Sequence, residues 1–236
     1  TTRGAVLGVT TVQRPSWQGA TLMLTGENRS TLAIWSEGDA PTVIPETQHI
    51  PVLLAKATAD GSTLLLVTAG GEGVQVFRSV KDSFASAPLV AVTGKVTNLQ
   101  FSPNGQYVLF RLDRISPANH ESDVLDITTG TIRRIANDAD GAMWDANGDG
   151  ILSWTSAGLL RLHTLSLDGT FQAPVAVRDS VVGNPIQMPT GKIVFILRTG
   201  DACSVMTHDL VTKEERLLTP LNLPVGDGCQ TFINLE

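Results

Sequence analysis

One short segment of the sequence has the residue types and the spacing of a calcium-binding loop. It reads Asp-Ala-Asn-Gly-Asp-Gly from residue 145, so Asp145, Asn147 and Asp149 place side-chain oxygens at alternate positions. Oxygen ligands at that spacing can wrap a hard cation such as Ca²⁺. The carboxylate that should complete the shell is missing, because Ser153 and Ser156 stand in its place. We therefore predict a hairpin turn without a metal ion, and calcium is the alternative.

The other residues that could carry chemistry form no recognisable catalytic or metal-binding pattern. The four histidines are scattered without metal-ligand spacing, no G-x-S-x-G motif occurs, and neither cysteine belongs to a CxxC motif. The segment Gly70–Gly73 lacks the strand–loop–helix context of a phosphate-binding loop. We expect the tryptophans, Trp154 among them, to be core residues. On these grounds the sequence predicts a protein that is not an enzyme and that holds no cofactor or metal.

The stretch Arg111–Asp123 is rich in charged residues and is predicted to be the longest loop of the chain. Loops on a rigid scaffold are where binding residues concentrate. If this loop contacts a partner, we expect five side chains to do so: Arg111, Asp113, Arg114, His120 and Glu121. The alternative is a solvated surface loop without a binding role.

Composition limits the classes of protein to which the chain can belong. Hydrophobic residues make up 42% of the sequence and charged residues 17%, which is enough apolar material for a large core. The net charge of −6 and the lack of any run of Lys or Arg longer than two argue against a nucleic-acid partner. The longest apolar runs have the length of a strand, so we expect no transmembrane segment. The start at Thr1 suggests a mature product after signal removal, or a fragment.

A turn signal recurs along the chain at intervals of 42 to 44 residues. Its five occurrences are Gln18-Gly19, Asp60-Gly61, Asn104-Gly105, Asn147-Gly148 and Thr190-Gly191. Each glycine supplies the positive φ that a tight hairpin turn needs, and a strand-like apolar segment follows it. Four antiparallel strands fit into each repeat of about 43 residues, the size of one propeller blade. The sequence therefore predicts an all-β propeller, and a β-sandwich is the alternative that a regular four-strand period does not support.

The third repeat resembles that of TolB-type β-propellers. The segment Leu99–Ala136 contains LQFSPNGQYVLFRLDR and SDVLDITTGTIRRIA, similar to the pattern F-S-P-D-G-K-x-I-x-F followed by I-Y-x-M-D-L-x-T-G. The fifth repeat matches with MPTGKIVFIL and SVMTHDLVTKEERLLT. This resemblance implies a propeller. Because such repeats occur in binding proteins and in peptidase-gating domains alike, it does not by itself imply an activity.

The two ends of the chain are predicted to form one incomplete blade of a six-bladed propeller. We expect a single domain, residues 1–236, made of a closing strand (1–12), five complete blades (13–219) and a partial blade (220–236). Two strands of the sixth blade are then missing, so we expect another protein, or a missing segment of this one, to complete it. Strand addition would use Gln230, Phe232 and Asn234. The alternative is that the two ends pair with each other.

The two cysteines bear on the compartment in which the protein works. Cys203 and Cys229 are expected on one face of the propeller, in adjacent elements, at a separation that permits a disulfide. Disulfides persist in oxidising compartments, so the sequence predicts a periplasmic or extracellular protein. The function predicted is that of an interaction or scaffold propeller, which binds a partner through its loop face or its open closing blade. The loop face is the face onto which the second-to-third strand loops and the loops leading to the next blade open. The alternatives are a hydrolase or lactonase with a metal in the channel, and a propeller that gates a larger enzyme.

Overall fold

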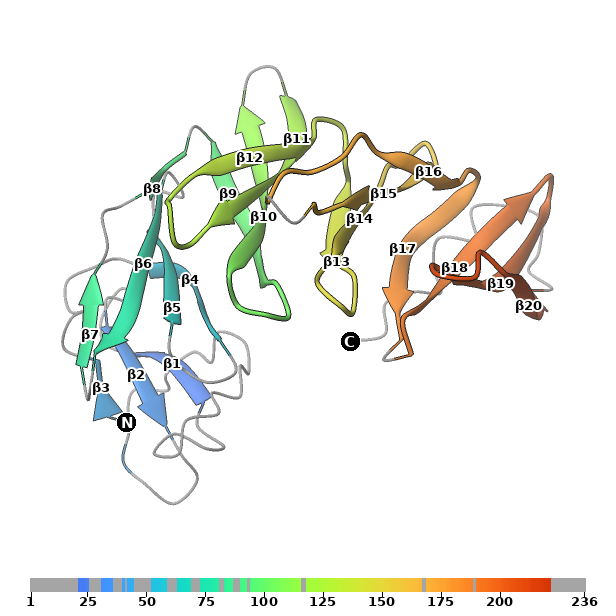
Figure 1. The fold of residues 1–236 in the computed structure, drawn as a ribbon. Coiled ribbons are helices and arrows are strands. Elements are labelled where there is room, and N and C mark those ends of the chain that lie inside the picture. The colour runs from blue at the N-terminus through green and yellow to red at the C-terminus, as the bar shows by residue number, and fades with distance from the viewer. Residues whose placement is uncertain are drawn as a thin grey trace. The chain divides into compact units, whose positions relative to one another are not determined.

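The described part of the chain is built from consecutive antiparallel β-sheets (Figure 1). The computed structural model describes residues 21–25, 31–35, 40, 42–44, 52–58, 63–68, 73–80, 83–86, 90–92, 94–115, 118–166, 169–188 and 190–221. No helix among these residues has the length and the apolar character required to cross a membrane. The all-β class that the sequence predicts is confirmed.

The strands follow one another in five sheets. The first contains β1 (Thr21–Thr25), β2 (Thr31–Trp35) and β3 (Thr42–Val43). The second contains β4 (Val52–Ala57), β5 (Thr63–Thr68), β6 (Gly73–Val80) and β7 (Ser83–Ser86), with β8 (Val90–Ala91) pairing with β6. The third contains β9 (Lys95–Phe101), β10 (Tyr107–Ile115), β11 (Ala118–Asp126) and β12 (Ile132–Ala136). The fourth contains β13 (Gly141–Trp144), β14 (Gly150–Trp154), β15 (Leu160–Thr164) and β16 (Val175–Arg178). The fifth contains β17 (Val181–Gln187), β18 (Lys192–Thr199), β19 (Ala202–Asp209) and β20 (Glu215–Leu221).

In the last three sheets the order in space equals the order in sequence, which is the four-strand meander that the repeat predicts. The predicted closing strand and partial blade, with Gln230, Phe232 and Asn234, lie outside the described residues. The described residues fall into two compact units. The first takes those within 1–101, 105–118 and 125–132, and the second takes those within 102–104, 119–124 and 133–236.

Each unit has an apolar core made by side chains at alternate strand positions. In the first unit, Leu65 and Val67 of β5 belong to one buried cluster with Val108 and Phe110 of β10. In the second unit, the buried members are Leu152, Leu160, Val181, Ile193 and Phe195. Burying one such side chain contributes about 1.5–3 kcal/mol relative to leaving it in water. Strand side chains alternate between the two faces of a sheet. This packing therefore also determines which residues face solvent or lie at the ends of the sheets.

The glycines of the repeat take the backbone conformation expected of them. Gly105, Gly148 and Gly191 have φ values of +70°, +79° and +79°, a region that residues with a Cβ rarely adopt. The Gly148 N–H donates to the Asp145 carbonyl at 3.1 Å, and the Gly191 N–H donates to the Met188 carbonyl at 2.9 Å. The preceding residues are not left-handed, so these connections are longer than two-residue hairpins and resemble turns that end in a left-handed glycine.

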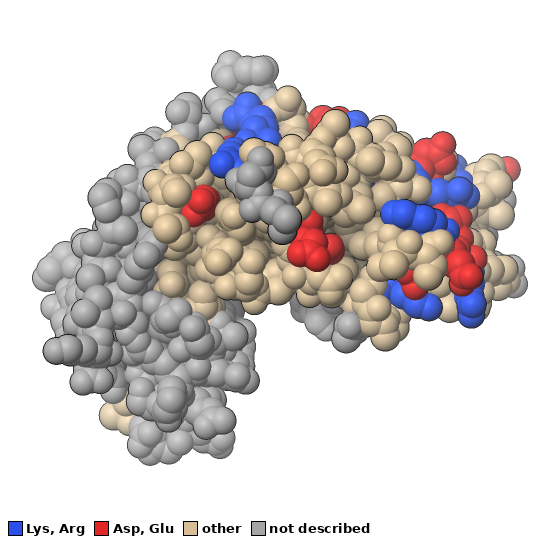
Figure 2. All heavy atoms as spheres, in the orientation of Figure 1, with Lys and Arg blue, Asp and Glu red and all other residues tan. Residues whose placement is uncertain are grey.

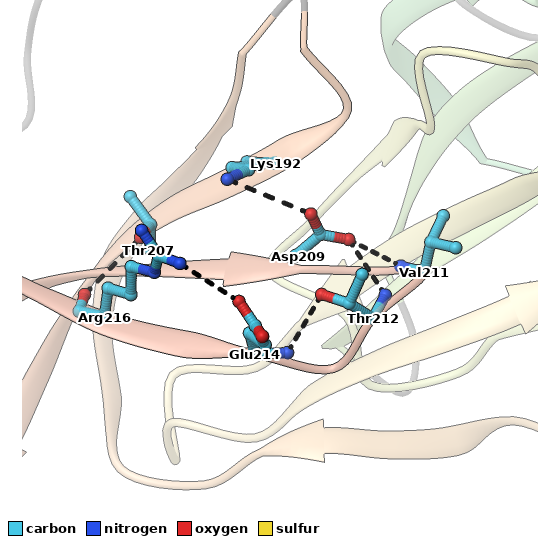
Figure 3. A network of polar contacts seen from close by, with 7 residues as sticks. All are labelled: Lys192, Thr207, Asp209, Val211, Thr212, Glu214 and Arg216. Carbon is cyan, nitrogen blue, oxygen red and sulfur yellow. Dashed lines mark hydrogen bonds and ion pairs between the residues drawn. The ribbon is translucent and has the colours of Figure 1, made fainter.

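A second turn is repeated between the third and fourth strands of the third and fifth sheets. In the fifth sheet, Asp209 Oδ1 accepts hydrogen bonds from the backbone N–H groups of Val211 and Thr212, both at 3.0 Å (Figure 3). The two backbone bonds lower the pKa of the Asp209 carboxyl. In the third sheet, Asp126 Oδ1 accepts from the N–H groups of the residues at the same positions, at 2.8 and 3.2 Å. The D-L-x-T-G element of the TolB-type pattern is therefore a structural turn in both sheets.

The two copies of this turn differ at the position that must be left-handed. Gly130 occupies it in the third sheet with φ of +73°, and Lys213 occupies it in the fifth with φ of +62°. The N–H of each donates to the carbonyl of the turn's aspartate, at 2.8 Å and 2.9 Å respectively. A left-handed conformation costs an L-residue roughly 1–2 kcal/mol, and glycine avoids that cost.

We expect Lys213→Gly to raise the free energy of unfolding by about 1 kcal/mol, since it relieves the left-handed strain. Gly130→Ala should lower it by about the same amount, because a Cβ there would have no neighbour within 4 Å and only the backbone would be strained. Urea denaturation followed by circular dichroism measures both changes. Lys213→Ala is the control, since it removes the charge and keeps the strain. A gain in Lys213→Ala equal to that in Lys213→Gly would show that strain is not the cause.

Candidate functional site

A cleft of about 640 Å³ opens in the second unit between the fourth and fifth sheets. Its walls come from the residue before β13, the β14–β15 connection, the start of β17 and the β18–β19 turn. The lining residues that carry its chemistry are Asp140, Trp154, Ser156, Asn184 and Arg198. The volume lies in the range typical of ligand sites. We call this site the cleft.

Trp154 ends β14 and reaches the cleft because Gly141 lies opposite it. The two residues are register partners between β13 and β14. A Cβ built on Gly141 would lie 2.2 Å from Cζ2 of the Trp154 ring, so any larger residue would displace the ring. The Trp154 Nε1–H donates to Asn184 Oδ1 at 3.1 Å. The indole therefore joins the fourth sheet to the fifth along one wall of the cleft.

An irregularity in β17 brings Asn184 to the cleft. Val182 pairs with Ile196 of β18, but the next pair is Ile186 with Val194, so three residues of β17 face one residue of β18. Gly183, the first of the three, has φ of +73°. A bulge of this kind bends a strand and re-aims its side chains, and bulges are frequent beside functional sites. Asn184 is exposed as a result.

The two sheets also meet through their backbones at the cleft. The Val181 N–H at the start of β17 donates to the Gly158 carbonyl of the β14–β15 connection at 2.9 Å. A Cβ on Gly158 would lie 2.9 Å from the Val181 carbonyl oxygen, and the φ of Gly158 is +87°. Both facts require glycine there. The Ser156 N–H donates to Asp140 Oδ2, which fixes the β14–β15 connection against the start of β13.

A serine and a histidine form a buried pair elsewhere on the fourth sheet. Ser153 Oγ and His163 Nε2 lie 2.8 Å apart, and the two residues are 1% and 3% exposed. Burial, with a smaller contribution from the positive charge of Arg161, lowers the pKa of His163 to about 4. His163 is therefore neutral near pH 7. The pair has the composition of a nucleophile and its base, but neither residue lines the cleft.

The prediction that Arg111–Asp123 forms a loop is wrong. These residues belong to strands β10 and β11, which lie on either side of residues 116–117. Arg111 Nε and Asp113 Oδ1 pair at 2.9 Å on β10. Glu121 pairs with Arg134 at 2.6 Å, and its side chain is only 4% exposed, so it is poorly placed to meet a partner. His120 is exposed, and the side chain of Arg114 lies outside the described residues.

The physical reason is that charged residues occupy one face of a long strand. The apolar residues Val108, Phe110 and Leu112 alternate along β10 and enter the core of the first unit, so Arg111 and Asp113 lie on the other face. The loop was predicted from the charged residues alone, although apolar residues continue to alternate along the same segment. None of the four described side chains among those predicted in this stretch, Arg111, Asp113, His120 and Glu121, lines the cleft.

The segment from Asp145 forms the turn that the sequence predicts. The Asp145 N–H donates to the Gly150 carbonyl at 2.9 Å, and Asp145 Oδ1 accepts from the Asp149 N–H at 2.9 Å. Burial raises the pKa of the Asp145 carboxyl, although its backbone hydrogen bonds oppose that change. In the described ranges, no group of three or more His, Cys, Asp or Glu residues is arranged to hold a metal ion. Backbone hydrogen bonding accounts for the turn, and the absence of calcium at Asp145, Asn147 and Asp149 stays a prediction.

Comparison with known proteins identifies the fold. Neither a family model nor a curated protein matches this sequence. Among solved structures, a candidate TolB from Agrobacterium tumefaciens is 19% identical, with a TM-score of 0.52 over 89% of this chain and 79% of that one. A candidate 6-phosphogluconolactonase from Bacteroides fragilis is 13% identical, with a TM-score of 0.52 over 88% and 68%. An oligogalacturonate lyase in complex with manganese is 13% identical, with a TM-score of 0.61 over 86% of this chain and 62% of that one.

These similarities define the class of the protein as a β-propeller. Within that class the chain has a TolB-like propeller fold, as the repeat in the third and fifth sheets predicts. It spans less than two thirds of some of these neighbours, including the lyase.

The prediction that the chain is not an enzyme is contradicted by the same comparison. Propellers named as a lactonase and a lyase share the fold, as does a dihydro-heme d1 dehydrogenase with a TM-score of 0.60 over 88% of this chain and 46% of that one. The prediction relied on the absence of local sequence motifs. A propeller assembles sites from residues of different repeats, so that absence is not informative.

The buried His163 predicts a pH-dependent loss of stability. Its pKa is about 4 in the folded protein and about 6.5 when unfolded, so between these values the unfolded chain binds a proton that the folded chain does not. We expect His163 to leave the free energy of unfolding unchanged with pH above pH 6.5. As the pH drops from 6.5 towards 4, that free energy should fall by up to about 3 kcal/mol. Urea denaturation at pH 7, 5.5 and 4.5 measures it.

His163→Gln is the matched variant, since it can keep a hydrogen bond to Ser153 without titrating in this range. It should be less stable than the wild type at pH 7, and the difference should shrink as the pH falls. A difference that stays constant from pH 7 to 4.5 would contradict the prediction.

Proposed function

We propose that this chain is a partner-binding propeller that recognises a protein at the cleft between its fourth and fifth sheets. The observation that carries the proposal is the cleft itself, with Trp154, Asn184 and Arg198 in its walls. Tryptophan and arginine are over-represented among the residues that dominate protein interfaces. The β14–β15 and β18–β19 connections form part of the cleft, and they belong to the loop face on which the sequence predicts binding.

The proposal concerns recognition and holds whether or not a reaction follows binding. The neighbours named as a lactonase and a lyase leave room for chemistry in a propeller of this fold. A protein that only binds a partner and an enzyme that acts on one must both first bind it in the cleft. The test of the proposal therefore addresses contact rather than turnover.

Site-specific photo-crosslinking tests the proposal directly. A benzophenone amino acid in place of Ser156, which is exposed at the cleft, should give a discrete protein adduct in the cells that produce this protein. The same group in place of Val211 is the control, because Val211 is 83% exposed and lies on the β19–β20 turn, outside the cleft. Mass spectrometry of the adduct identifies the partner. Equal adducts at both positions, or none at Ser156, would overturn the proposal.

We further propose that the protein works in an oxidising compartment, periplasmic or extracellular. Cys203 is 2% exposed at the start of β19, and we propose that it forms a disulfide. Cys229, the other cysteine of the sequence, lies outside the described residues. A bridge between them would close a loop of roughly 26 residues and stabilise the fold by about 3.5 kcal/mol in the chain-entropy account.

Thiol labelling of the unfolded, unreduced protein should therefore find no free thiol. Reduction before labelling should reveal both cysteines and lower the free energy of unfolding by about 3 kcal/mol. Purification from a bacterial periplasm, with a thiol-blocking reagent present from lysis onward, keeps the native redox state. Two labelled thiols in the unreduced sample would be incompatible with the bridge and would remove this support for the compartment.

A further inference from the structure

The cleft offers hydrogen-bond donors that the described residues do not use. The Arg198 Nε–H donates to the Gly200 carbonyl at 3.1 Å, and no ion pair of Arg198 is formed within the described part of the chain. The terminal nitrogens of a guanidinium carry four more donor hydrogens. Arg198 is exposed and lines the cleft, so these donors can reach a ligand there.

Arg198 differs in this respect from most arginines of the described residues. Five others pair with carboxylates: Arg111, Arg134, Arg161, Arg178 and Arg216. Arg133 also has no such pair among the described residues, but it does not line the cleft. On part of the described surface in view, Lys and Arg lie beside Asp and Glu (Figure 2), so their charges offset one another there. Arg198 is thus a cationic group that lines the cleft and has no counter-ion among the described residues.

The other polar side chains of the cleft add donors to that cation. Because the Trp154 indole can only donate, Asn184 must present its oxygen to it, and the Asn184 NH₂ group is left with two donors. The Ser156 hydroxyl also has no partner in the described residues. The carboxylate of the cleft, Asp140, is engaged by the Ser156 N–H. The cleft therefore suits a ligand that brings acceptors and a negative charge.

The backbone at the β17 bulge favours a polypeptide as the carrier of that charge. Gly183 and Asn184 have no register partners on β18, and β17 is an edge strand of the fifth sheet, which is where an extended chain can add. We propose that the cleft binds an acidic segment of the partner polypeptide, with Arg198 as the counter-ion of an Asp, Glu or C-terminal carboxylate. Arginine and a carboxylate form bidentate hydrogen bonds that are stronger than neutral ones. This inference rests on the proposed function, since it presumes that the partner enters the cleft.

Fluorescence anisotropy with labelled hexaglutamate as the probe tests the inference. The wild-type protein should bind hexaglutamate at least ten times more tightly than labelled hexaglutamine. Arg198→Gln should lose at least tenfold in affinity for hexaglutamate. Arg216→Gln should bind like the wild type, since Arg216 is an exposed arginine of the same sheet paired with Glu214, outside the cleft. Circular dichroism and urea denaturation confirm that both variants are folded.

The other outcomes each overturn the inference. Equal losses in Arg198→Gln and Arg216→Gln would indicate general charge attraction, and absence of hexaglutamate binding would exclude an acidic segment. Binding of a labelled hexamer of galacturonic acid in place of hexaglutamate would assign the cleft to an acidic saccharide.

Photo-crosslinking from position 156 in the Arg198→Gln background separates this inference from the proposed function. A lost adduct supports both. An adduct that persists undiminished shows that the partner uses the cleft without a carboxylate, which overturns the inference and keeps the proposed function. An adduct that is absent even with Arg198 intact overturns the proposed function itself.

Discussion

Face-to-face packing of neighbouring four-stranded sheets is the interaction on which the described structure depends. A lone meander of four short strands cannot bury enough apolar surface to be stable in water. In the second unit, Leu152 and Leu160 of the fourth sheet share one core with Ile193 and Phe195 of the fifth. This packing holds the ends of the two sheets together, and the cleft exists only because those ends are fixed. The polar residues of the cleft are thus positioned by apolar residues that do not touch it.

Several polar side chains of this arrangement bond to partners close by. Asp126 and Asp209 bond to the backbone of their own turns, and Ser153 bonds to His163 across two neighbouring strands. Such pairs limit the cost of burying or constraining polar atoms, which is high when a partner is missing. The cleft differs from these pairs, because its exposed Arg198 has no counter-ion among the described residues.

Much of the fold could be predicted from the sequence, because turn glycines and apolar alternation are local signals. The glycines at 105, 148 and 191 are left-handed as the repeat requires, and the strands that follow them lie where the apolar segments predict. The cleft could not be predicted in the same way. Its residues come from strand ends and connections that are separated in sequence, and Trp154, which was expected in the core, packs against the core and also lines the cleft. Gly141 was the available signal, since a glycine opposite a tryptophan in neighbouring strands leaves room for the ring against the backbone.

The hydrogen bond between Trp154 and Asn184 has a consequence for how the chain unfolds. In repeat proteins, the free energy of the whole is close to a sum of terms for each repeat and for each contact between neighbours. Trp154 belongs to the fourth repeat and Asn184 to the fifth, so this bond contributes to a contact term rather than to either repeat. A ligand that touches both residues adds its binding free energy to the same term. Occupancy of the cleft would therefore couple the two repeats into one cooperative unit, in which neither sheet opens without the other.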